Sequence, residues 1–299
     1  MNFSIKKLKK FGFFSGNDFI LSEEEVNILV AKIDGMYKDK LNEKLLDYSS
    51  NAPVLQNLYG RDKIVDSYLN KIVNNDQFKN TFETILGKNY KIWEISTRYS
   101  MGYDKGLEMH SDGKGQMNFI MYLNDQMNSE GVTAIWPRSH LLNRLSNFTS
   151  WRNMSFIWRF FTKPLNGKKG NYFFFINKTW HGRLPKKNNK ITKALFFGCY
   201  SEGSSYNPIS GSELNYKNLE NSELKKRISF EDGKFNKNTG EFIISYKSHS
   251  QENKTFAYKI ERFSFINFLK NIDQLILLLL LEVILFIPYR VYRLRKFKF

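Results

Sequence analysis

The sequence predicts a mainly β domain with helices packed around it. Three observations lead to this prediction: an alternating apolar pattern from Gln116 to Leu123, a continuous apolar run from Tyr172 to Ile176, and a helix-start signal at Ser22. Alternation indicates a strand with one buried face, and a short run that is apolar on both faces is typical of a fully buried strand. The 299 residues are enough for one large domain with extensions.

The first predicted helix begins with a capping box. Ser22 is followed by Glu25, and in this pattern the two side chains bond to each other's backbone N–H groups. Leu21 is available as a hydrophobic staple. The apolar face of this helix contains Val26, Leu29, Val30 and Ile33. We expect further helices between residues 62 and 86, on the outside of the sheet, and then a strand over Trp93–Tyr99 that enters the barrel.

Four later segments are predicted to be strands. Met117, Phe119, Met121 and Leu123 alternate with more polar neighbours, and Asn124-Asp125 supplies a turn. A short strand within residues 131–140 is closed by Pro137. The run from Tyr172 to Ile176 is the buried strand, and a last strand covers Ile191–Tyr200.

Three residues in this region form a possible metal-ligand set. His110 and Asp112 are two positions apart, and side chains at positions i and i+2 of an extended chain point the same way. His181 follows the buried strand. Two histidines and one carboxylate make the facial triad of non-haem Fe(II) oxygenases, which leaves three coordination positions for a chelating co-substrate and O2. His140, in the same region, is assigned a structural role because the ligand set is already complete.

Several segments resemble a known family. YLND, GVTAIWPRSH, GNYFFFINKTWHGRLP and NNKITKALFFGCY are similar to the phytanoyl-CoA dioxygenase branch of the 2-oxoglutarate/Fe(II) dioxygenases. The resemblance covers about residues 10–206 and is strongest from His110 onward. It implies a double-stranded β-helix (jelly-roll or cupin-like) core, Fe(II) held by His110, Asp112 and His181, and 2-oxoglutarate and O2 as co-substrates. The family's usual P-G-S-H turn is altered to Pro137-Arg138-Ser139-His140.

The resemblance also implies a basic residue about a dozen positions past the distal histidine. This residue holds the far carboxylate of 2-oxoglutarate, and Lys193 occupies the place where the family usually has arginine. Lysine offers a point charge where arginine offers a bidentate fork. Lys190 is the competing candidate. Tyr99, Asn118 and Arg183 are further candidates for contacts with the co-substrate. The alternative is that Tyr99 and Asn118 are ordinary β-sheet residues and that Arg183 is a solvated or structural arginine.

Three regions follow from these patterns: an oxygenase-like domain with N-terminal helices over residues 1–205, a polar extension with one hairpin over 206–269, and an apolar, basic C-terminal segment over 270–299. Within the domain, residues 151–161 are rich in Trp, Phe and Arg. They are either an amphipathic lid over the site or an ordinary helix that covers the sheet.

The C-terminal segment suggests contact with a membrane surface. Leu275–Ile287 is apolar except for Glu282, and five basic residues follow Pro288. A bilayer span needs about 20 apolar residues, so we expect an in-plane or shallow anchor, with a docking helix as the alternative. The net charge of +17 fits an anionic lipid surface, and no nucleic-acid-binding motif accompanies it.

The predicted location is cytoplasmic, peripheral on a membrane. Cys199 is the single cysteine, which favours a reducing compartment, and residues 1–14 lack the apolar run of a signal peptide. The expected function is Fe(II)/2-oxoglutarate-dependent hydroxylation of a lipid or lipid-linked substrate. The alternatives are the same chemistry on a small soluble metabolite, and a catalytically silent jelly roll that binds at a membrane. Oligomeric state does not follow from the sequence.

Overall fold

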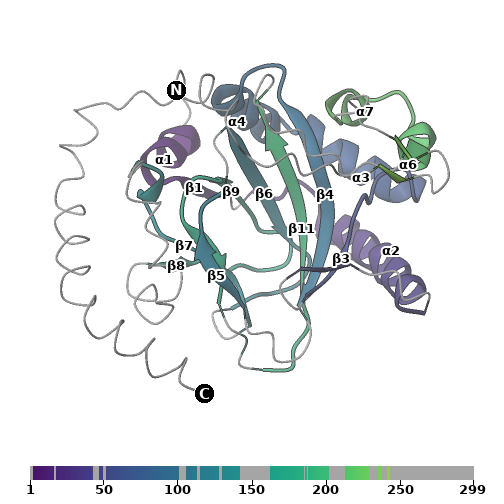
Figure 1. The fold of residues 1–299 in the computed structure, drawn as a ribbon, viewed down its shortest axis with the longest axis horizontal. Coiled ribbons are helices and arrows are strands. Elements are labelled where there is room, and N and C mark those ends of the chain that lie inside the picture. The colour runs from purple at the N-terminus through teal and green to yellow at the C-terminus, as the bar shows by residue number, and fades with distance from the viewer. Residues whose placement is uncertain are drawn as a thin grey trace.

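The core consists of two antiparallel sheets that face each other (Figure 1). The computed structural model describes residues 3–16, 18–42, 47–49, 52–100, 106–112, 115–127, 130–141, 162–184, 186, 188–201, 213–228, 235–236 and 241–242. The larger sheet has the order β1 (Phe13–Gly16), β9 (Tyr172–Ile176), β6 (Gln116–Tyr122), β11 (Thr192–Tyr200), β4 (Lys91–Ser100), β3 (Ala52–Leu55) and β2 (Asp47–Ser49). The smaller sheet has the order β5 (Leu107–His110), β10 (His181–Arg183), β7 (Thr133–Ile135) and β8 (Lys163–Pro164). This arrangement confirms the predicted mainly β, jelly-roll core.

Helices cover the outer face of the seven-stranded sheet. These are α2 (Glu23–Asn42), α3 (Lys63–Asn74) and α4 (Asp76–Leu86), and Figure 1 shows α2 and α3 on the opposite side of this sheet from the four-stranded one. The capping box predicted for α2 is present, because the Ser22 amide donates to Glu25 Oε2 (2.7 Å) and the Glu25 amide donates to Ser22 Oγ (3.2 Å). Asp62 and Asn75 are the N-cap residues of α3 and α4, and each side chain accepts hydrogen bonds from two backbone amides of the first turn.

The two faces of the large sheet contain alternate residues of each strand. On β6, Met117, Phe119 and Met121 belong to the core cluster beneath the helices, whereas Ile120 and Tyr122 belong to a second cluster between the sheets. On β11, Leu195 and Phe197 face the helices and Ala194 and Phe196 face the small sheet. We call these the outer and inner faces. Directly paired residues of antiparallel strands share a face, so this division extends across the sheet.

Aromatic rings fill the centre of the outer face. The ring of Phe78, on α4, lies 5.1 Å from Phe119, 6.1 Å from Phe174 and 5.4 Å from Phe197, as measured between centroids. All four side chains are fully buried. Edge-on and tilted contacts of this kind add to the stabilisation from burial. This cluster therefore joins the helical layer to the sheet.

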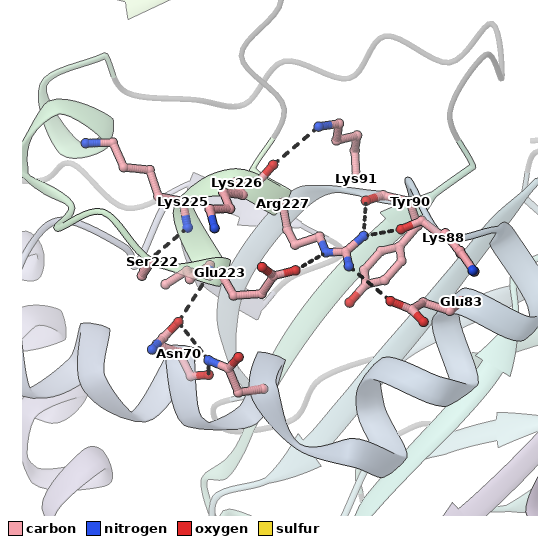
Figure 2. A network of polar contacts seen from close by, with 12 residues as sticks. Asn70, Glu83, Lys88, Tyr90, Lys91, Ser222, Glu223, Lys225, Lys226 and Arg227 are labelled. Carbon is pink, nitrogen blue, oxygen red and sulfur yellow. Dashed lines mark hydrogen bonds and ion pairs between the residues drawn. The ribbon is translucent and has the colours of Figure 1, made fainter.

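Residues 213–228 complete the same core. They form α6 (Glu213–Asn218) and α7 (Glu223–Arg227), and Leu219, Leu224 and Ile228 are buried members of the outer cluster. Arg227 holds this segment in place (Figure 2): Nε donates to Glu223 (2.7 Å), Nη2 donates to Glu83 (3.2 Å), and the guanidinium stacks 4.2 Å from the Tyr90 ring. The domain thus includes part of what the sequence assigned to a polar extension beginning at residue 206.

Other elements follow or refine the predictions. A hairpin of β12 (Phe235–Asn236) and β13 (Glu241–Phe242) lies within the region where one was expected. Helix α1 (Phe3–Phe11) and strand β1 were not predicted. The lid candidate at residues 151–161 and the C-terminal segment at 270–299 lie outside the described residues. Within the described part of the chain, no helix is both long and apolar enough to cross a membrane.

Candidate metal centre

The two predicted histidine ligands lie side by side on the small sheet. His110 ends β5 and His181 begins β10, and the two residues are direct partners in the antiparallel pairing. Their ring centroids are 4.5 Å apart. Asp112 follows β5 by two residues, and its carboxylate oxygens lie 3.5 Å from His110 Nε2 and 3.3 Å from His181 Nε2. The structure thus brings together three residues that are widely separated in the sequence.

Backbone contacts fix the ring of His181 and the segment that carries Asp112. His181 Nδ1 lies 2.8 Å from the carbonyl oxygen of Thr179, which can only accept a hydrogen bond. The N–H is therefore at Nδ1 and the Nε2 lone pair points toward Asp112, as in metal-binding histidines. The Asp112 amide donates to the Asn177 carbonyl (2.9 Å), which anchors the segment after β5 to the turn before β10.

The spacing of the three groups fits one metal ion. One ligand atom from each of His110, Asp112 and His181 lies within 4.8 Å of the others. Ligand atoms about 2.1 Å from a divalent first-row ion are about 3 Å apart when they occupy neighbouring octahedral positions. The His–Asp distances are only slightly longer than this value. Two imidazoles and one carboxylate on one side of an ion leave its other side open.

Burial and charge act in opposite directions on Asp112. Burial raises the pKa of its carboxyl, but a protonated His181, which then also carries a hydrogen at Nε2 and donates it to Asp112, lowers the pKa, as do the charges of His110 and Arg98. Together these effects outweigh burial, so the net pKa lies below the usual value. The side chain of His181 is 8% exposed, whereas that of Asp112 is 37% exposed. The centre is therefore enclosed on the His181 side and open to solvent at Asp112.

The turn after β7 supports the His181 end of the centre. Arg138 has a φ of 68°, in the left-handed region that glycine adopts most easily, and this is where the related P-G-S-H turn has its glycine. The Ser139 hydroxyl accepts from the Trp180 amide (2.7 Å), next to His181. His140 Nε2 lies 3.0 Å from the Lys9 carbonyl, which agrees with a structural role.

Lys193 and Tyr99 face away from the metal centre. They are direct partners in the pairing of β11 with β4, and Tyr99 belongs to the outer cluster. Lys193 Nζ contacts both carboxylate oxygens of Asp34 on α2, each at 2.7 Å, and the Tyr99 hydroxyl donates to Asp34 (2.6 Å). Their assignment to the co-substrate must be corrected, because a molecule bound at the triad would lie on the opposite side of the sheet.

The other three candidates are distributed differently. Lys190 lies in the loop before β11, where Nζ bonds to Glu130 Oε1 (2.9 Å) and to the Asp125 carbonyl (2.9 Å). Asn118 is on the inner face of β6, and its buried Oδ1 has no hydrogen-bond partner within the described part of the chain. Arg183 shares a face with His181, because the two pair with Thr133 and Ile135 of β7 in an unbroken register. Asn118 and Arg183 therefore remain candidates for contacts with a bound molecule.

Sequence reasoning missed a polar group on the inner face of β4. Arg98 pairs with Ala194, and its Nη2 lies 3.2 Å from Glu94 Oε1, which also accepts from the Ser96 hydroxyl. The available signal in the sequence was that Glu94, Ser96 and Arg98 are polar residues at alternate positions of the predicted strand over residues 93–99. Without the pairing of β4 with β11, that signal does not say which of the two faces is the inner one.

Comparison with known proteins identifies the fold. The sequence matches no protein-family model and no curated protein. Among solved structures, AviO1 from Streptomyces viridochromogenes Tue57 is similar at a TM-score of 0.54 and 13% identity, over 69% of this chain and 96% of that one. HygX from Streptomyces hygroscopicus, solved with nickel and 2-oxoglutarate bound, gives 0.52 and 12%, over 68% and 88%. SnoK, a non-haem α-ketoglutarate-dependent carbocyclase from nogalamycin biosynthesis, gives 0.56 and 12%, over 71% and 89%.

This chain has the fold of the 2-oxoglutarate-dependent oxygenases. Identities of 12–13% establish the architecture and not the activity. The predicted fold class is confirmed, and the metal-ligand set lies at the β5–β10 pair of the small sheet.

Proposed function

We propose that the chain is an Fe(II)- and 2-oxoglutarate-dependent oxygenase that hydroxylates its substrate. The observation that carries this proposal is the convergence of His110, Asp112 and His181 inside a jelly roll, with ligand atoms within 4.8 Å of one another. HygX, which has this fold, binds nickel and 2-oxoglutarate, and that finding supports the same co-substrate here.

His110, Asp112 and His181 would hold the ferrous ion. When bound, Fe(II) supplies the redox chemistry that couples oxidative decarboxylation of 2-oxoglutarate to oxygen transfer. The overall reaction converts 2-oxoglutarate, O2 and a substrate R–H into succinate, CO2 and R–OH. One oxygen atom goes to succinate and the other to the substrate.

The chain's own residues orient the ligands and exclude water. Thr179 keeps the Nε2 of His181 available for the metal. The ring of Phe175 packs 4.7 Å from the His181 ring and belongs to the apolar cluster between the sheets. Asp112 fills the third ligand position, so a halide has no vacated place there, and this favours hydroxylation over halogenation.

Anaerobic titration with Fe(II) and 2-oxoglutarate tests the proposal. We expect the weak visible absorption band of a 2-oxo acid chelated to Fe(II) in the wild-type protein, and no band in His181→Ala. His140→Ala is the matched control, because it removes a buried histidine that lies outside the ligand set. A wild-type protein with neither the band nor metal affinity would instead favour the silent binding module.

The substrate class requires a separate proposal. A lipid or lipid-linked substrate is supported by the apolar and basic sequence of residues 270–299. A small soluble metabolite is the second candidate, because HygX has been solved with hygromycin B bound.

Truncation after Lys270 distinguishes the two candidates. For a membrane substrate, we expect the truncated protein to lose binding to anionic vesicles and to retain the Fe(II)·2-oxoglutarate band. Equal vesicle binding by the full-length and truncated proteins would argue against the membrane substrate.

A further inference from the structure

The inner face of β11 lacks a basic residue where the co-substrate's far carboxylate would need one. The positions of β11 that face the small sheet are Thr192, Ala194, Phe196, Gly198 and Tyr200, and none of them is cationic. Lys193, one position away, is bound to Asp34 on the outer face. An anionic group that lies between the sheets must therefore find its counter-ion on another strand.

Arg98 supplies a positive charge at the adjacent place on β4. It lies directly opposite Ala194, so its side chain projects into the space between the sheets. The guanidinium carbon lies 4.4 Å from the centroid of the Phe196 ring, and Nη2 is 3.2 Å from Glu94 Oε1. Stacking on one side and an ion pair at one end hold the planar group in a fixed orientation.

Part of the guanidinium has no partner. Nε of Arg98 is buried and makes no hydrogen bond among the described residues. A buried N–H of a charged group that lacks an acceptor is costly, more so than for a neutral group. Arginine binds carboxylates in a bidentate fashion through neighbouring N–H groups, and Nε–H is one of these. The Nε edge of Arg98 is therefore suited to a carboxylate that the protein itself does not provide.

The register of the sheet places this group near the metal centre. The Phe175 ring, which packs against His181, lies in the same row of the sheet as Asn118, Gly198 and Glu94. Arg98 contacts Glu94, so its guanidinium extends along the strand toward that row. A dicarboxylate that is chelated to the metal by one end would carry its other carboxylate into the space between the sheets, into which Arg98 projects.

We propose that Arg98 binds the distal carboxylate of 2-oxoglutarate. The basic residue that related enzymes carry on the strand after the distal histidine is thus replaced, in this chain, by one on the neighbouring strand β4. Glu94 is a positioning residue, because it holds Nη2 and leaves Nε available. This inference rests on the proposed function, and it identifies which of the candidate cations selects a dicarboxylic co-substrate.

The test compares two 2-oxo acids that differ only at the distal end. 2-Oxoglutarate and 2-oxopentanoate are titrated anaerobically into the Fe(II)-loaded protein, and Kd is read from the charge-transfer band. A charge-assisted bidentate contact leads us to expect that the wild-type protein binds 2-oxoglutarate roughly 30- to 100-fold more tightly. Arg98→Gln should lose most of this preference while its Kd for 2-oxopentanoate stays the same. Arg98→Lys should restore part of it.

Lys193→Gln is the matched variant. Lys193 lies on the outer face and is bound to Asp34, so this variant should retain the wild-type preference for the dicarboxylate. Arg183→Gln is measured alongside as the competing candidate, because Arg183 shares a face with His181. The unchanged affinity of Arg98→Gln for 2-oxopentanoate shows that the variant is folded and its metal centre intact.

Two results would overturn the inference. If Arg98→Gln discriminates between the two acids as the wild type does, the distal carboxylate is bound elsewhere, and whichever of the other two variants has lost the preference identifies the site. If the wild type chelates neither acid, the proposed function fails and the inference fails with it. The first result leaves the oxygenase proposal intact, so the two failures are distinguishable.

Discussion

The outer and inner faces of the seven-stranded sheet are built by the same strands but have different chemical characters. Fully buried aromatic side chains, such as Phe119, Phe174 and Phe197, occupy the centre of the outer face. The inner face combines apolar side chains with the Arg98–Glu94 pair and looks toward the metal centre. Because neighbouring residues of a strand point in opposite directions, a shift of one position moves a side chain from the aromatic core of the outer face to the inner face, which looks toward the metal centre.

The largest stability difference between the faces is expected at the aromatic cluster. Phe119→Ala should lower the free energy of unfolding by about 3–5 kcal/mol, because it opens a cavity among well-packed rings. Phe196→Ala, at a half-buried inner position, should cost about 1–2 kcal/mol. Urea denaturation of the two variants measures both values. Equal losses would mean that the two faces contribute equally to stability.

Metal binding should stabilise the protein through the ligands on the small sheet, which the inner face looks toward. A divalent ion at 100 times its Kd raises the free energy of unfolding by about 2.7 kcal/mol if it binds only the folded state. We expect this increment with Fe(II) under anaerobic conditions in the wild type and in Phe119→Ala, and none in His181→Ala. Thermal unfolding with and without the metal measures it. A full increment in His181→Ala would place the metal elsewhere.

Lys193 should affect stability and not co-substrate binding. Its ion pair with Asp34 is partly exposed, with side-chain exposures of 19% and 42%, so Lys193→Gln should cost only about 1 kcal/mol. A double-mutant cycle with Asp34→Asn isolates the pair, and the two substitutions together should cost less than the sum of the single ones. Strictly additive effects would show that the contact contributes nothing.

The smallest expected effect is at Arg138. Replacement by glycine removes the strain of the left-handed backbone, which should stabilise the folded state by about 1 kcal/mol. Two effects oppose this gain: glycine increases the conformational freedom of the unfolded chain, and the contact of the guanidinium with Phe11 is lost. The net gain in the free energy of unfolding should therefore be under about 1 kcal/mol. Arg138→Ala keeps the strained backbone and should not be stabilising. Chemical denaturation of both variants separates backbone strain from loss of the side chain.

The sequence was most informative where a local pattern determines the structure. The capping box at Ser22, the alternation along β6 and the apolar run of β9 correspond to the observed elements, and the spacing of His110 and Asp112 is that of two side chains on one side of an extended segment. Each of these signals is contained within a few neighbouring residues, so pairing with distant strands is not needed to interpret it.

Features that depend on distant pairing were not predicted. Counting from His181 through the loop before β11 cannot give the face of Lys193, because a single added or removed loop residue reverses it. The role of Arg98 depends on the pairing of β4 with β11, which joins segments almost a hundred residues apart. Strand β1 has only four residues at the sheet edge and therefore lacks a usable alternation.

The burial of Leu219, Leu224 and Ile228 has a consequence for synthesis on the ribosome. These residues complete a hydrophobic cluster whose other members begin at Leu8, so the domain cannot close its core until the chain has emerged through Ile228. Synthesis from Tyr200 to Ile228 takes about 1–6 s at 5–20 residues per second. During that interval the face of α3 and α4 that later receives α7 is exposed to the nascent chain's surroundings. Chaperones that bind apolar surface therefore have their best opportunity at this stage, after β11 has emerged and before α7 has docked.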